Sequence, residues 1–299
     1  MLSHTKGRNR KVAPLFLCRA RILFDFSRNS AKLIRYMHLP RFASRRAFSL
    51  VEMSIVLVII ALIVGGIMEG RSLLRASEVR TVITDANAYK GAITQFKTQY
   101  RYLPGDMPNA QQYWPTTVNG NGNGIVEYTS FGTGSTASVA GGPNEAFLFW
   151  QHLALAGMVQ GNYNGLADPA STVGYTIGVN SPLAQVDGVV WGASYVDCRG
   201  GCGNIFNRDY RDWLTVGSLL DVVYADSPFL TTSEAYSIDT KMDDGLPGAG
   251  IVQMTYDNYG MFGTAAEGCS NAASGADFGA SYKLSNTAKN QCGLLFKYP

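Results

Sequence analysis

The sequence predicts an α+β protein in which one long N-terminal helix packs against a small antiparallel sheet with large loop insertions. Two observations lead to this prediction. An apolar run at residues 48–68 continues into a stretch with helical periodicity. Residues 103–299 instead alternate short apolar runs with turns rich in glycine and asparagine, which is typical of strands and loops. This second part is long enough to bury a core of its own.

The apolar run at residues 48–68 is long enough to cross a lipid bilayer, because a spanning helix needs roughly 20 apolar residues. Arg45 and Arg46 precede it and are expected to stay in the cytoplasm, so the rest of the chain should lie on the far side. A signal peptide or a plain membrane anchor would share these features. Neither explains Glu52, because a carboxylate near an apolar core is disfavoured by a few kcal/mol and needs a partner.

Residues 47–52, with the sequence AFSLVE, resemble the processing site of type IV pilins and type II secretion pseudopilins. The resemblance implies that a prepilin peptidase cuts between Ala47 and Phe48 and methylates the new amine of Phe48. It also implies that Glu52 neutralises this amine on a neighbouring subunit as a filament assembles. Glycine usually precedes the cut in this family, and Ala47 is also small. The implied partners are the peptidase, other subunits and the inner membrane.

Residues 1–47 form the basic leader that such processing would remove. The leader is long for this family, and a start at Met37 would give a leader of ordinary length. It holds 12 of the 25 Lys and Arg residues and one of the 22 acidic residues, so the net charge of +3 becomes −8 in the mature part. The remaining basic residues are thinly spread, so no nucleic-acid partner is expected.

Beyond the span, apolar residues recur at steps of three and four from Leu74 to Tyr100, which places them on one helical face. Pro104 and Gly105 then break the pattern. The sequence therefore predicts one helix over residues 48–102, half in lipid and half amphipathic, followed by a globular head at residues 103–299. A long helix packed on such a head is also the architecture that the pilin resemblance implies.

Within the head, strands are expected at residues 188–191 and 251–256, and helices at residues 144–156 and around 218–223. The glycine and asparagine repeat at residues 119–124 alternates like a calcium-binding EF-hand loop, but its amides carry no charge. We therefore predict a turn there.

Four cysteines follow the leader, and an even number downstream of a membrane span favours disulfides. We favour a local bridge between Cys198 and Cys202, whose glycine-containing loop is flexible, together with a bridge between Cys269 and Cys292, among three possible pairings. The second bridge would tie down the C-terminal segment, where pilin-like heads often carry one. A four-cysteine zinc site is the alternative, but the spacing fits zinc poorly.

An acidic turn is the candidate metal site. Asp239, Asp243 and Asp244 offer three carboxylates around Gly245, and calcium prefers such hard oxygen ligands. The turn also resembles the acidic C-terminal loop with which major pseudopilins hold calcium. A solvated turn is the alternative reading. No other cofactor is expected.

Catalysis is the least favoured class of function. The mature part has one histidine, His152, inside an apolar helical run, where a packed residue is more common than a base. The sequence contains no nucleophile elbow, phosphate loop or histidine-rich metal motif. Adjacent carboxylates such as Asp243 and Asp244 seldom converge on one substrate atom.

These features favour a structural subunit of a type IV pilus or a type II secretion pseudopilus. It would sit first in the bacterial inner membrane, with its head in the periplasm, and later in the filament. A minor pilin or tip adhesin is one alternative, with glycan-binding rings among Trp114, Trp150, Trp191 and Trp213. A plain bitopic membrane protein with a periplasmic binding domain is another, and it would tolerate loss of Glu52.

Overall fold

The computed structural model describes most of the chain after residue 48. The described residues are 49–128, 144–168, 171, 174–200, 205–219, 225, 227–255, 268–272 and 274–299. The chain divides into two compact units, Met1–Leu57 and Val58–Pro299. The second unit holds most of the long helix and the whole head.

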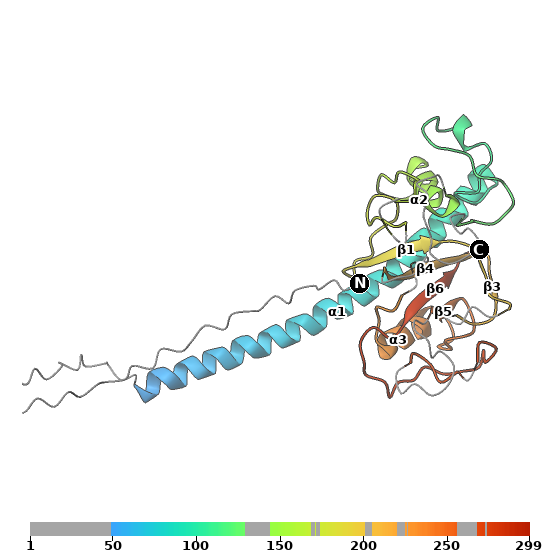
Figure 1. Ribbon diagram of the computed structural model, residues 1–299. Coiled ribbons are helices and arrows are strands. Elements are labelled where there is room, and N and C mark those ends of the chain that lie inside the picture. The colour runs from blue at the N-terminus through green and yellow to red at the C-terminus, as the bar shows by residue number, and fades with distance from the viewer. Residues whose placement is uncertain are drawn as a thin grey trace, which may run out of the picture. The chain divides into compact units, whose positions relative to one another are not determined.

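Helix α1 runs unbroken from Leu50 to Tyr100, 51 residues in all (Figure 1). Every side chain from residue 49 to residue 69 is exposed. Farther along, Val82, Ala86, Ile93 and Phe96 are fully buried, and their spacing by three, four and seven places them in one stripe. The helix ends where Arg101 adopts a left-handed conformation, with a φ of 67°. The prediction of one continuous helix is therefore confirmed. Its first half is exposed, and its second half has a buried apolar stripe.

A four-stranded antiparallel sheet packs against the second half of α1, as predicted. Its spatial order is β1-β4-β6-β5, built from β1 (Val189–Ala193), β4 (Trp213–Ser218), β6 (Gly293–Lys297) and β5 (Val252–Thr255). A separate two-stranded ribbon pairs β2 (Val196–Asp197) with β3 (Asp209–Tyr210). A long helix followed by an antiparallel sheet with loops is a pilin-like layout.

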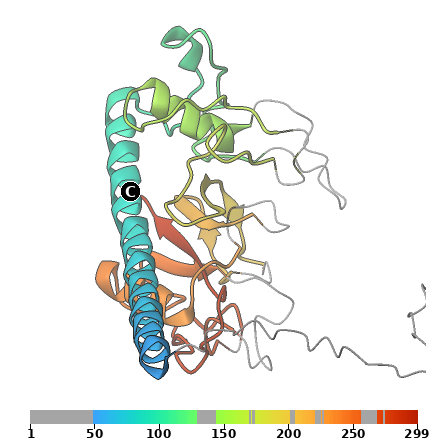
Figure 2. The same ribbon diagram turned by 90° about the vertical axis from the view of Figure 1, so that its left-hand side faces the viewer.

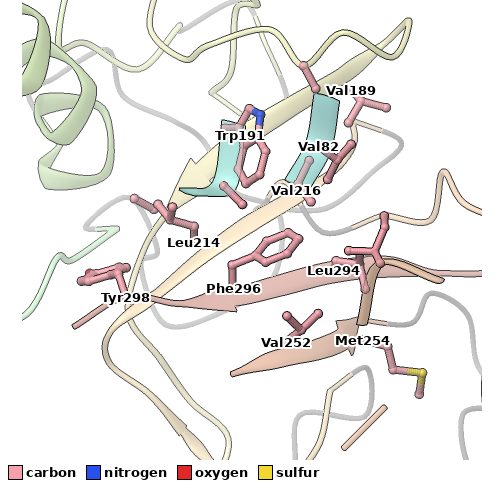
Figure 3. Packing of buried hydrophobic residues seen from close by; sticks show 14 of the residues in the cluster. Val82, Val189, Trp191, Leu214, Val216, Val252, Met254, Leu294, Phe296 and Tyr298 are labelled. Carbon is pink, nitrogen blue, oxygen red and sulfur yellow. The ribbon is translucent and has the colours of Figure 1, made fainter. Parts of the chain in front are cut away.

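The main core lies between α1 and one face of this sheet. In the register of the strands, Trp191 lies opposite Val216, and Leu214 lies opposite Phe296. These side chains gather with Val82 of α1 in one buried cluster (Figure 3). Successive residues of a strand point to opposite faces, so the neighbouring side chains of β4 and β6 belong to smaller clusters behind the sheet.

Both edges of the sheet are covered by loops. At the β5 edge, the backbone N–H of Met254 donates to the carbonyl of Pro247 over 2.9 Å. At the β1 edge, the N–H of Trp191 donates to the carbonyl of Pro182 over 3.1 Å. Because these edge groups are already paired, the sheet is poorly suited to extend into a neighbouring chain.

Three shorter helices lie in the described part of the head. They are α2 (Glu145–Leu155), α3 (Thr232–Met242) and the 3-10 helix η1 (Ala110–Gln112). Tyr89 of α1 joins α2 to the sheet, since its ring lies 5.0 Å from that of Trp150 and 5.2 Å from that of Trp191. Figure 2 shows α2, α3 and the strands all lying beside the second half of α1.

The predicted strands and the predicted helix at residues 144–156 are confirmed, whereas the helix expected around residues 218–223 is not. Ser218 is the last residue of β4, and residues 220–224 lie outside the described residues. The sequence reasoning missed α3, because this helix is polar and lacks a continuous apolar stripe. Its signal was a capping box, in which Thr231 and Glu234 satisfy each other's backbone N–H groups.

Candidate functional sites

Glu52 lies in the first turn of α1 and is exposed. Its carboxylate accepts a hydrogen bond of 2.8 Å from the backbone N–H of Ser49, and the hydroxyl of Ser49 accepts one of 3.3 Å from Val51. Glu52 therefore helps to cap the start of the helix. Ala47 and Phe48, the predicted processing and methylation sites, lie outside the described residues.

The first half of α1 presents an apolar surface. The helix is long and apolar enough to cross a membrane, and no residue of its most apolar 18-residue window is buried. A core helix of a soluble protein would be covered by its own chain, whereas these side chains are covered by no other described residue. A bilayer, or the same half-helix of other subunits, would remove this surface from water.

The three aspartates of the predicted metal site come together at the C-terminal end of α3. Each of Asp239, Asp243 and Asp244 can offer one carboxylate oxygen, and these oxygens lie within 4.8 Å of one another. Two ligands bound to one calcium ion at about 2.4 Å are at most about 4.8 Å apart, so the donor set fits such an ion. The negative end of the helix dipole at this position also favours a cation.

Backbone and side-chain donors fix the geometry of this acidic cluster. Asp239 is fully buried and accepts hydrogen bonds from the Tyr282 hydroxyl, at 2.9 Å, and from the N–H of Gly245, at 3.1 Å. Asp243 accepts from the N–H of Val252 at 3.1 Å, which ties the cluster to the start of β5. The positions of the carboxylates are therefore set by the fold.

The buried position of Asp239 has an electrostatic consequence. Burial raises the pKa of Asp239 to about 7, and the nearby carboxylates of Asp244 and Asp243 act in the same direction. The bonds from Tyr282 and Gly245 offset only part of this effect. Ionisation of Asp239 is therefore disfavoured in the folded chain, and a bound divalent cation would reverse this effect.

The bridge between Cys269 and Cys292 is confirmed, with a Cα–Cα distance of 5.4 Å. It links the segment before Tyr282 to the start of β6, so it ties down the C-terminal part of the head, as predicted. Cys198 is buried. Its expected partner, Cys202, lies outside the described residues, so this pairing stays a prediction.

His152 is a buried residue of α2 that joins two parts of the head. Its Nδ1 accepts a hydrogen bond of 2.9 Å from the N–H of Gly105, five residues beyond the end of α1, and its Nε2 lies 3.4 Å from the carbonyl of Val118. Burial lowers the pKa of His152 to about 4, so the ring is neutral at pH 7. This environment fits the packed role that the sequence suggested.

The glycine and asparagine repeat forms a turn held by two buried carboxylates. Asp106 accepts hydrogen bonds from the N–H groups of Asn123 and Gly124, at 3.0 and 2.9 Å. Glu145 accepts from the N–H groups of Asn121 and Glu127, at 2.8 and 3.0 Å. The carboxylates thus bind the backbone of this segment, as expected for a structural turn.

The four tryptophans do not form a shared exposed surface. Trp150, Trp191 and Trp213 are buried in the head. Trp114 is half-buried and packs edge-on against Tyr100, at 5.2 Å between ring centroids, near the end of α1. The tryptophans therefore serve mainly as core, which gives no support to a glycan-binding surface built from them.

An ion pair fastens α3 to α1. The guanidinium of Arg75 forms two bonds to the carboxylate of Glu234, at 2.7 and 3.0 Å, and a third to the carbonyl of Phe229, at 2.9 Å. No local sequence pattern predicted this contact, because the two charged residues lie 159 positions apart.

Comparisons of the chain with protein-family models, with curated proteins and with solved structures found no match.

Proposed function

We propose that this chain is a structural subunit of a pilus or pseudopilus, held in the inner membrane by α1 and assembled into a helical filament through the same helix. One observation carries the proposal. A 51-residue helix exposes an apolar half with Glu52 in its first turn and packs its other half on an α+β head. Assembly would bury the exposed half among neighbouring subunits, which is favourable in proportion to the apolar area removed.

Processing by a prepilin peptidase would leave Phe48 with a methylated amine, four positions before Glu52. A carboxylate in an apolar environment needs a partner, and the amine of an adjacent subunit would provide one. The helix surface around Glu52 supports this role, because the side chain is exposed and its surroundings are apolar. Pairing with the amine would then set the register of neighbouring subunits.

The first test is intact mass spectrometry on the protein expressed with a prepilin peptidase. A chain that begins at methylated Phe48 and lacks four cysteine hydrogens would support the pilin pathway and two disulfides. An unprocessed chain, or one cut after the apolar run, would contradict the pathway. The result would then favour an anchored or secreted binding domain.

The second test separates the charge of Glu52 from its capping of the helix. Glu52→Gln keeps an oxygen that can accept from Ser49 but removes the charge, whereas Glu52→Ala removes both. We expect both variants to be processed and inserted normally but to form no filaments. Glu69→Gln, at the other end of the apolar run, is the matched control and should assemble. Normal filaments from Glu52→Gln would refute the pairing with the amine.

We also propose that Asp239, Asp243 and Asp244 hold a calcium ion that stabilises the head. The support is their geometry, three oxygens within 4.8 Å at the C-terminal end of a helix. Calcium would neutralise the repulsion among the carboxylates and fix the loop that follows α3. Nothing in this role requires the ion to take part in a reaction.

A further inference from the structure

Tyr282 is a buried residue that links the acidic cluster to the C-terminal part of the head. Its hydroxyl donates a hydrogen bond of 2.9 Å to Oδ2 of Asp239, while Oδ1 of Asp239 accepts from the N–H of Gly245. Only 6% of the Tyr282 surface is exposed, and Asp239 is fully buried. Among the described residues, Tyr282 is the side chain that donates to this carboxylate, so it helps to fix where the two oxygens point.

The ring of Tyr282 also packs on α3. It meets the ring of Tyr236 edge-on, with the ring centroids 5.8 Å apart. Tyr236 lies one turn before Asp239 on the same helix, so the ring and the hydroxyl of Tyr282 contact two successive turns of α3. The hydroxyl of Tyr236 donates to none of the three aspartates of the acidic cluster. The two tyrosines therefore differ in their relation to the cluster, although they touch each other.

The segment that carries Tyr282 is hydrogen-bonded to the segment that carries Cys269. The N–H of Asn271 donates to the carbonyl of Ser281 over 3.0 Å, and the side-chain oxygen of Asn271 accepts a bond of 2.8 Å from the N–H of Ser281. Ser270 lies opposite Tyr282 in this short antiparallel pairing. The position of Tyr282 therefore depends on where the chain next to Cys269 is held.

The disulfide to Cys292 connects this pairing to the start of α3. The N–H of Leu230 donates to the carbonyl of Cys292 over 3.0 Å, and the N–H of Cys292 donates to the carbonyl of Leu230 over 3.1 Å. Leu230 directly precedes Thr231, the N-cap residue of α3. Cys292 is thus fixed at the first end of α3, whereas Tyr282 contacts Asp239 in its last turn. The loop that the bridge closes therefore holds α3 at both ends.

We propose that Tyr282 is a positioning residue for the calcium site and that the bridge between Cys269 and Cys292 acts on the site through it. The tyrosine would keep one oxygen of Asp239 within 4.8 Å of the carboxylate oxygens of the other two aspartates, and the bridge would hold the tyrosine. Groups that orient metal ligands contribute about 10- to 100-fold to metal affinity. A head whose bridge has not formed would therefore bind calcium weakly. This inference rests on the proposed calcium site and is independent of filament formation.

Calcium titrations of the full-length processed protein in a neutral detergent test the positioning role. Terbium replaces calcium at oxygen sites and luminesces when nearby tyrosine rings are excited, so calcium affinity is read from the midpoint at which calcium displaces it. Tyr282→Phe keeps the ring and the bridge and removes the hydroxyl, so it should weaken calcium binding at least about 10-fold. That midpoint would not move if the hydroxyl only stabilised the fold.

Tyr236→Phe is the matched control. It removes a neighbouring hydroxyl that does not bond to the aspartates, so it should leave the calcium midpoint unchanged. An equal loss of affinity in Tyr236→Phe and Tyr282→Phe, or no loss in Tyr282→Phe, would overturn the proposal.

A double-mutant cycle tests the route from the bridge to the site. Replacing Cys269 and Cys292 by alanine should also weaken calcium binding about 10-fold, but it should add little in the Tyr282→Phe background. Losses that multiply would overturn the proposed route. Asn271→Ala guards against misfolding of the variant without the bridge, because it removes only the side-chain bond to Ser281. It should weaken calcium binding in the wild-type background and not in Tyr282→Phe, and equal losses in both would count against the route.

The wild-type titration separates the positioning role from the calcium site itself. If the wild-type protein binds neither terbium nor calcium, the three aspartates are not a calcium site and the positioning role fails with it. If the wild type and all the variants bind calcium equally well, the site stands and only the role of Tyr282 and the bridge is refuted.

Discussion

Replacing Asp239 by asparagine should stabilise the head at pH 8 in the absence of calcium. Asparagine has nearly the same shape, and its amide can still accept from Gly245 while its NH₂ group donates to the hydroxyl oxygen of Tyr282. The substitution therefore keeps the bond from Gly245, reverses the direction of the bond with Tyr282 and removes the buried charge. The variant tests mainly the electrostatic contribution of this carboxylate to the stability of the fold.

The magnitude follows from the pKa of Asp239, which rises from its usual 3.8 to about 7 in the folded chain. Below pH 3.8 the carboxyl is protonated in both states and has no effect. As the pH rises from 3.8 to about 7, the carboxyl ionises in the unfolded chain but stays protonated in the folded one. The folded state therefore loses stability over this range, until the pH exceeds 7. At 1.36 kcal/mol for each pKa unit, the full effect is about 4 kcal/mol.

Urea unfolding of the full chain in detergent, at pH 4 and pH 8 with EDTA, measures this difference. We expect Asp239→Asn to gain about 4 kcal/mol over the wild type at pH 8 and little at pH 4. Asp187→Asn, which replaces an exposed aspartate, is the control and should gain no stability at either pH. Destabilisation by Asp239→Asn at pH 8 would refute the conclusion that the buried Asp239 carboxylate is unfavourable when ionised.

Calcium should reverse the order of stability, so that the wild type becomes more stable than Asp239→Asn. A ligand that binds only the folded state stabilises it, so calcium at pH 8 should raise the wild-type midpoint strongly. It should raise that of Asp239→Asn much less, because one charged ligand is missing. If calcium leaves the wild-type midpoint unchanged relative to EDTA, the three aspartates are not a calcium site.

Three further predictions concern the core of the head. Because the pKa of His152 falls from 6.5 to about 4, its contribution to stability should fade as the pH drops through that window. The stability difference between wild type and His152→Gln should therefore shrink by about 3 kcal/mol between pH 7 and pH 4 in parallel urea titrations, and a constant difference would contradict this. Replacing Cys269 and Cys292 by alanine should cost about 3 kcal/mol, from the 23-residue separation that the bridge spans, and an unchanged unfolding midpoint would rule this out. Phe96→Ala should cost about 3–5 kcal/mol and expose the head side of α1 to proteolysis, whereas a loss below 1 kcal/mol would mean that this buried ring does not join the helix to the head.

The sequence by itself predicted the features that depend on local pattern. The apolar run, the three- and four-residue periodicity of α1 and the helix-breaking residues after it predicted a helix over residues 48–102, within two residues of each observed end. Alternating short apolar runs gave two of the strands, and the number and placement of cysteines gave the bridge between Cys269 and Cys292. The helix and turn signals are local because helices and turns form through hydrogen bonds between residues only a few positions apart.

Only the tertiary structure decided how distant polar residues meet. It buried Asp239 against Tyr282 and paired Arg75 with Glu234 across 159 positions. It also revealed α3, whose polar sequence carries a capping signal but no apolar stripe. The physical reason is that burial and electrostatic coupling depend on which surfaces the whole chain brings together, and no local pattern of residues specifies that.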